Sequence, residues 1–161
     1  MSQSVPPPGN PFAEGAVPQA PFAPPPPVRN NVGLGLAAAL GAALVAAGVY
    51  GGIVGAIERE IGFLAIGVGY LVGLAAGKVG GPNPVLPVAA AALSLGAVYL
   101  GQIFGLAILL AKEVNLGTTE VLLDHFGLLT EAWKEDADPV SFLFFAIAAF
   151  AAFSGAKKAA S

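Results

Sequence analysis

Two long stretches without a charged residue constrain this chain more than any other feature. One runs from Val32 to Ile57 and the other from Val85 to Ala111, and neither contains an Asp, Glu, Lys or Arg. Each stretch exceeds the roughly 20 apolar residues with which an α-helix crosses about 30 Å of hydrocarbon. A helix satisfies its backbone hydrogen bonds internally, as lipid requires. The sequence therefore predicts two transmembrane helices, at 32–57 and 85–111.

Two shorter apolar runs predict two further spans. Residues 61–77 and 140–156 contain 17 residues each, which is the lower edge of the spanning range, and charges flank both. The alternative for each is a re-entrant or interfacial segment. The composition supports a membrane protein, since only 11% of the residues are charged, against about 25% in soluble domains. We expect an all-α membrane protein whose domain 32–158 is a four-helix transmembrane bundle.

The N-terminal segment 1–31 differs sharply from this domain. It holds ten of the fourteen prolines and has no basic start or short apolar core of a secretory signal. Such a segment lacks the apolar residues that offset the entropy of ordering, so we expect a disordered proline-rich tail. The tail is interpreted as a soluble tether, with small docking motifs at Asn10–Phe12 and Ala20–Phe22 as the alternative.

Residues 118–134 predict an amphipathic helix between the third and fourth spans. Leu122, Phe126, Leu129 and Trp133 recur at helical spacing, and acidic residues occupy the other side. An amphipathic helix with a tryptophan is typical of the membrane surface. Trp133 is therefore the expected interfacial anchor of this helix.

The basic residues near the span ends indicate the orientation. With the tail in the cytoplasm, the cytoplasmic side carries Arg29, Lys78, Lys157 and Lys158, and the outer side carries Arg59, Lys112 and Lys134. Abundant Ala and Gly with few Lys is typical of a GC-rich bacterial genome. We expect a multi-pass protein of the bacterial cytoplasmic membrane with both termini in the cytoplasm.

Glycines at four-residue spacing predict close helix packing within the spans. Small residues at this spacing form a flat groove that admits a neighbouring helix, within one chain or in a homo-oligomer. The candidate packing positions are Gly48, Gly52, Gly69, Gly73, Gly77, Gly101 and Gly105.

The spans contain few polar groups on which chemistry could depend. Tyr99 and Gln102 are the candidate intramembrane polar pair, and an interhelical hydrogen bond from Gln102 to a tyrosine is the expected arrangement. The chain has no cysteine and one histidine, His125, whose side chain diverges from that of Asp124 on a helix. No nucleophile–base pair or phosphate loop is present in the sequence, so we expect no catalytic, cofactor-binding or metal site and no enzyme.

One family resemblance rests on residues of the second and fourth spans. The stretches Glu60–Gly62, Ala65–Gly69 and Val72–Gly73, with Asp138 and the Phe-rich Phe142–Ala148, resemble small uncharacterised bacterial proteins with four transmembrane helices. Those proteins often carry N-terminal zinc-ribbon or adaptor regions, and here the proline-rich tail occupies that place. The resemblance covers residues 32–158 and implies a membrane location and four spans, without an activity.

Two functions of different classes are consistent with these features. The first is a non-enzymatic membrane scaffold or accessory subunit whose tail binds a cytoplasmic protein partner. The second is an oligomeric pore or small-solute transporter, lined by the glycine faces with Gln102 and the tyrosines. The lipid bilayer is the expected environment, and nucleic acid is not an expected partner because no basic patch exists.

Overall fold

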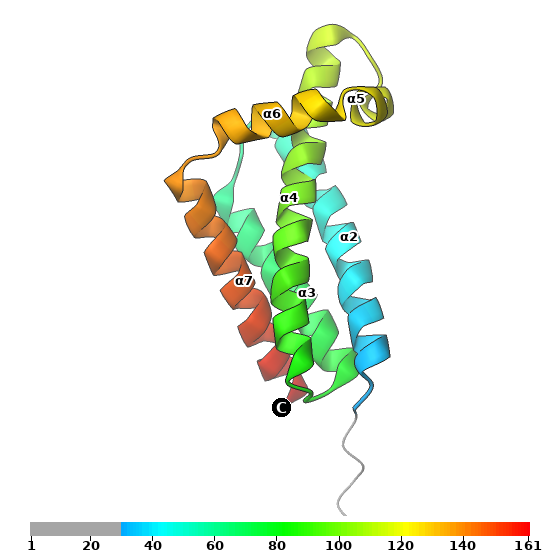
Figure 1. The fold of residues 1–161 in the computed structure, drawn as a ribbon, viewed down its shortest axis with the longest axis vertical. Coiled ribbons are helices and arrows are strands. Elements are labelled where there is room, and N and C mark those ends of the chain that lie inside the picture. Colours follow the sequence, from blue (N-terminus) through cyan, green and yellow to red (C-terminus); the bar gives the residue numbers. More distant parts are fainter. Residues whose placement is uncertain (1–29) are drawn as a thin grey trace, which may run out of the picture.

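A computed structural model describes residues 30–161, and this part of the chain is entirely helical (Figure 1). Four long helices form an up-and-down bundle: α2 (Val32–Ile57), α3 (Gly62–Gly80), α4 (Val85–Val114) and α7 (Pro139–Ala160). Two short helices, α5 (Thr118–Asp124) and α6 (Phe126–Asp136), lie across one end of the bundle. The predicted tail lies outside the described residues except for Asn30 and Asn31.

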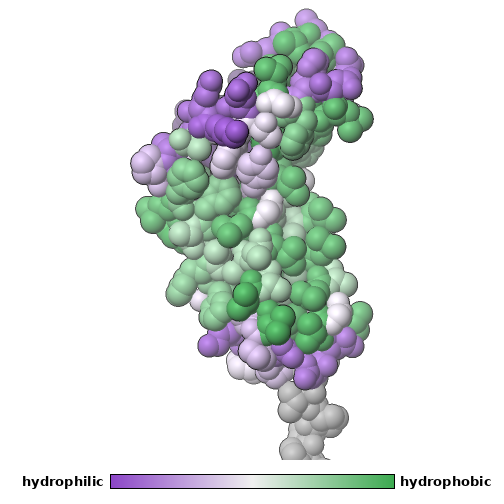
Figure 2. Space-filling view, viewed as in Figure 1, coloured by the Kyte–Doolittle hydropathy of each residue, from purple (hydrophilic) through white to green (hydrophobic). Residues whose placement is uncertain are grey.

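The four bundle helices are each long and apolar enough to cross a membrane, which confirms the prediction of four candidate spans. They contain 26, 19, 30 and 22 residues. The two runs of minimal length are therefore extended at their ends, into α3 and α7. Figure 2 shows a broad apolar band across the visible face of the bundle, with polar residues gathered at its two ends, as expected for a bilayer-spanning surface.

Local signals in the sequence set the ends of these helices. Asp138 caps α7 by accepting a hydrogen bond from the Ser141 amide at 2.8 Å, and Pro139 follows as the first helical residue. The turn between α3 and α4 has Gly81 at φ 85°, a conformation that side chains other than glycine rarely adopt. These termini agree with the breaker residues between the apolar runs.

Asparagine side chains tie the start of α2 to the turn between α3 and α4. The Asn31 side chain caps α2 by accepting from the backbone amide of Leu34 at 3.1 Å, and the backbone amide of Asn31 donates to the Gly80 carbonyl at 2.9 Å. The Asn83 side chain donates to Asn30 at 2.9 Å. The point where the chain enters the bundle is therefore fixed beside this turn.

Glycines bring α3 and α7 into backbone contact. A Cβ built on Gly69, Gly73 or Gly77 would lie 2.1 Å from the carbonyl oxygen of Ala148, Ala152 or Ala156, respectively. Each glycine Cα–H therefore faces an alanine carbonyl, an arrangement typical of Cα–H···O contacts between helices. The regular four-residue repeat on both helices keeps them parallel to each other along three turns.

The second close interface joins α2 to α4. Gly101 and Gly105 of α4 lie against Tyr50 and Val54, and a Cβ on either glycine would stand 2.6 Å or 2.8 Å from those side chains. Gly48 and Gly52, which were also predicted to pack, have no described heavy atom within 4 Å of such a Cβ. They lie on a face of α2 that no other part of residues 30–161 covers.

The predicted amphipathic helix 118–134 is two helices rather than one, because α5 ends at Asp124 and α6 begins at Phe126. Val121 of α5 and Leu129 of α6 are buried against Ile103, Ala107 and Ala111 of α4. The pair of helices is thus docked on the upper part of α4. Leu123 and Leu128, by contrast, are 76% and 57% exposed.

Candidate functional site

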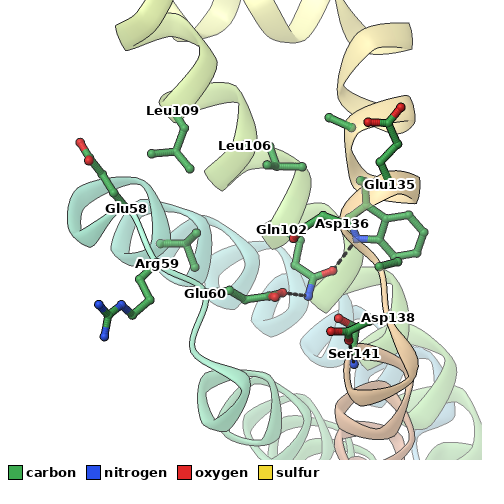
Figure 3. Close-up of a pocket in the computed structure, with 14 residues that line it drawn as sticks. Glu58, Arg59, Glu60, Gln102, Leu106, Leu109, Glu135, Asp136, Asp138 and Ser141 are labelled. Carbon is green, nitrogen blue, oxygen red and sulfur yellow. Dashed lines mark hydrogen bonds between the residues drawn. The ribbon is translucent and has the colours of Figure 1, made fainter.

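A vestibule of about 740 Å³ opens at the end of the bundle that carries α5 and α6. Its walls come from the end of α2, the turn between α2 and α3, the middle of α4, the end of α6 and the link to α7 (Figure 3). The volume lies within the range of small-molecule sites, about 300–1,000 Å³.

Gln102 of α4 is the buried polar group at the centre of this vestibule. Its side chain is 8% exposed, its Nε2 donates to a carboxylate oxygen of Glu60, and its Oε1 accepts from Trp133 Nε1 at 2.6 Å (Figure 3). The described hydrogen bonds of Gln102 thus go to a carboxylate and an indole, and Tyr50 lines the adjoining cavity with it. Three elements that are distant in the sequence meet at this one amide.

Trp133 of α6 is one of the residues that line the vestibule. Its ring packs edge-on against Tyr99 at 4.9 Å, Phe145 at 6.1 Å and Phe142 at 6.4 Å between centroids. Edge-to-face pairs at these separations are favourable beyond the area that they bury. The predicted interfacial anchor thus lies on the bundle, and Tyr99 supports it rather than lining the vestibule.

Negative charge dominates this end of the molecule. Nine carboxylate side chains lie here, against three side chains of Lys and Arg. Lys112 is occupied, since its Nζ donates to the Gly55 carbonyl at 2.9 Å and pairs with Glu58 at 3.3 Å. In Figure 3, Arg59 extends away from Gln102. The carboxylates nearest the amide therefore have no described cation beside them.

The vestibule changes the pKa values of two of these carboxyl groups in opposite directions. Burial raises the pKa of Glu60, and the carboxylates of Asp136 and Asp138 raise it further, while the hydrogen bond from Gln102 opposes the change. The pKa of Asp138 is lowered, chiefly because the Ser141 amide donates to it at the start of α7. Asp136 and Asp138 are thus close enough to Glu60 for their charges to act on it.

This arrangement predicts how stability varies with pH. A folded-state pKa above the ordinary value of 4.5 means that the folded protein binds more protons than the unfolded chain between those two values. The contribution of Glu60 to stability is therefore greatest at acid pH and is lost as the pH rises through its raised pKa. We expect Glu60→Gln to raise the melting temperature at neutral pH, measured in detergent, and to flatten its fall above pH 4.5.

The control is Glu120→Gln on α5, an acidic residue that does not line the vestibule. It should leave the pH profile unchanged. An unaltered profile in Glu60→Gln as well would contradict the assignment to Glu60.

Sequence reasoning found Gln102 and Trp133 as candidate residues but not Glu60, which it named only among the residues of the family resemblance. The lengths of the predicted helices could have shown that Glu60 lies beside Gln102. α3 and α4 meet at the same turn and both extend from it toward the same end of the bundle, so the nineteenth residue of α4, Ile103, stands level with Gly62 at the far end of α3. That count places Gln102 beside Glu60, at the end of the bundle.

Comparison of the chain with protein-family models, with curated proteins and with solved structures found no match. The function is therefore argued from the geometry of the vestibule.

Proposed function

We propose that this protein is a non-enzymatic accessory subunit of the membrane that receives a positively charged ligand in its vestibule. The observation that carries the proposal is the group of carboxylates around Gln102: Glu60, Asp136 and Asp138 line the same vestibule, and no described cation is paired with them. A cleft lined by one sign of charge concentrates ligands of the opposite sign. The pocket also has apolar walls, at Val54, Leu106 and Leu109, against which a ligand can bury surface.

The packing of the bundle favours a receptor over a pore lined by the glycine faces. Gly69, Gly73 and Gly77 are covered by α7 of the same chain, and Gly101 and Gly105 by α2. Below the vestibule the centre of the bundle is filled by small side chains, among them Ala39, Val72, Ala76 and Ala90, each 0% exposed. These glycines therefore pack against helices of the same chain and do not line a pore.

Binding of cations by the full-length protein in nanodiscs tests this function. The probes are a linear triamine, a monoamine, Mg²⁺ and a lysine-rich peptide, each titrated by calorimetry with an anionic peptide as control. We expect at least one cation to bind, and binding to weaken as salt is added. The variant Glu60→Gln, Asp136→Asn, Asp138→Asn should lose it, and asparagine at 138 keeps a good helix cap.

The matched control is Glu120→Gln, Asp124→Asn, Glu131→Gln, which removes three charges from α5 and α6 without touching the vestibule lining. It should bind as the wild type does. Failure of every cation to bind, or equal loss in both triple variants, would contradict the proposal.

The proposal includes the topology predicted from the basic residues, with both termini in the bacterial cytoplasm and the vestibule outside. The charge of the two ends supports it, because Lys78, Lys157 and Lys158 lie at the end opposite the carboxylates. We expect reporters fused after Lys78 to be cytoplasmic and those fused after Lys134 to be external. The reverse pattern would place the vestibule inside the cell.

A further inference from the structure

A second, smaller cavity adjoins the vestibule and reaches into the bundle. It has a volume of about 140 Å³, and Glu60, Gln102, Asp138 and Ser141 line both spaces. Its inner wall is Tyr50 of α2. The vestibule and this cavity therefore adjoin through shared side chains, and we call them the wide outer part and the narrow inner part of the site.

The hydroxyl of Tyr50 is the unusual group in the inner cavity. Tyr50 is 1% exposed, and its hydroxyl has no hydrogen-bond partner among the described residues. Buried hydroxyl groups in proteins are normally paired, because an unpaired one loses its bonds to water without replacement. Glu60 and Gln102 line the same cavity, yet neither is bonded to this hydroxyl, and a ligand with N–H groups could donate to its oxygen.

The distribution of charge indicates how many positive groups this ligand carries. Glu60 belongs to the turn between α2 and α3, whereas Asp136 ends α6 and Asp138 lies in the link to α7. Apolar side chains of α2 and α4, at Val54, Leu106 and Leu109, line the space of the outer part. Carboxylates on separate walls of a space that also has apolar lining match ammonium groups separated by methylene segments.

A bare metal ion fits this site less well. Within residues 30–161, no three His, Cys, Asp or Glu side chains are grouped as ligands of one ion. Ca²⁺ takes six to eight oxygen ligands at about 2.3–2.6 Å, and Mg²⁺ requires near-octahedral geometry. A flexible organic cation can instead contact carboxylates that are spread over a large space.

Resting on the proposed function, we infer that the site binds a linear aliphatic polyamine, with one terminal ammonium in the inner cavity between Tyr50, Glu60 and Gln102. The terminal N–H groups donate to the Tyr50 hydroxyl oxygen and to the Glu60 carboxylate. The methylene chain lies along the apolar wall of α4, and the next ammonium stands near Asp136 and Asp138. Trp133 covers the chain from the side of α6.

Spermidine binding to Tyr50→Phe in nanodiscs tests this inference. The substitution removes only the hydroxyl, and without ligand we expect a melting temperature equal to or above that of the wild type, because an unpaired buried group is removed. The loss of a hydrogen bond to a charged donor should weaken spermidine binding by about tenfold or more. Tyr70→Phe is the matched control, since Tyr70 lies on α3, is 40% exposed and lines neither cavity.

The remaining outcomes separate this inference from the proposed function. Spermidine affinity that is equal in Tyr50→Phe and wild type overturns the placement of the ammonium in the inner cavity. Binding of Mg²⁺ or of the lysine-rich peptide in preference to spermidine overturns the polyamine and leaves a cation receptor. Absence of binding by all of these probes overturns both.

Discussion

Gly73→Ala should lower the thermal stability of the detergent-solubilised protein more than any other single methyl group added to α3. The new Cβ would lie 2.1 Å from the carbonyl oxygen of Ala152, and the atom that it meets is backbone, which cannot move aside alone. Helix α7 must shift, which also loosens the contacts of Gly69 and Gly77 on either side. Overpacking of a close interface lowers the free energy of unfolding by on the order of 1–3 kcal/mol. The larger side chain of Gly73→Ile should lower it by more than that.

The same helix provides the control. Gly67→Ala adds a methyl group where no described heavy atom lies within 4 Å, so steric conflict is absent. Alanine also favours a helix over glycine by about 0.8–1.0 kcal/mol. Gly67→Ala should therefore melt at or above the wild-type temperature. Equal melting of the two alanine variants would show that α3 and α7 are not in contact through Gly73.

Leu129→Asp should release α6 from the bundle. Leu129 is 1% exposed and packs with Ile103, Ala107 and Val121. Removal of a buried leucine side chain lowers the free energy of unfolding by about 2–5 kcal/mol. A carboxylate at this position would also be taken out of water without a partner. Trp133, the only tryptophan, reports the result. Its emission should lie at short wavelength in wild-type nanodiscs and move to long wavelength, with easier quenching, in the variant.

Leu128→Asp is the control on the neighbouring residue. Leu128 is 57% exposed, so an aspartate there remains at the surface and α6 stays docked. The Trp133 emission should be unchanged. A water-like emission maximum in the wild type would contradict the contacts of Trp133 with Gln102 and Tyr99.

The helices of the bundle could be predicted because each depends on a local property of the sequence. The absence of charge from Val32 to Ile57 predicts a helix, and the helix-breaking residues around Pro82 predict where helices end. Neither prediction depends on what the helix packs against. The amphipathic segment was predicted less well, since its periodicity continues across His125 while the backbone does not. The break lets Val121 and Leu129 both reach α4, and that requirement comes from the shape of the bundle.

The site was predictable only in part, for a similar reason. Gln102 attracts notice in an apolar span, and Trp133 on an amphipathic segment. Glu60 and Tyr50 become part of a site only when the bundle brings them beside Gln102. Sequence spacing contains no information about an unpaired hydroxyl, because the pairing depends on contacts between helices. The same holds for Gly48 and Gly52, whose spacing equals that of Gly69 and Gly73 although they face away from the chain.

The unequal lengths of α3 and α4 have a consequence for how the vestibule meets its surroundings. The two helices leave one turn, but α3 contains 19 residues and α4 contains 30. At 1.5 Å per residue, α4 continues about 16 Å beyond the end of α3. Lys112 braces this extension against Gly55 and Glu58 at the end of α2. The distance between the vestibule and the apolar part of the bundle is consequently set by the protein itself. Lipids of different chain length should therefore change the tilt of the bundle without changing the dimensions of the vestibule.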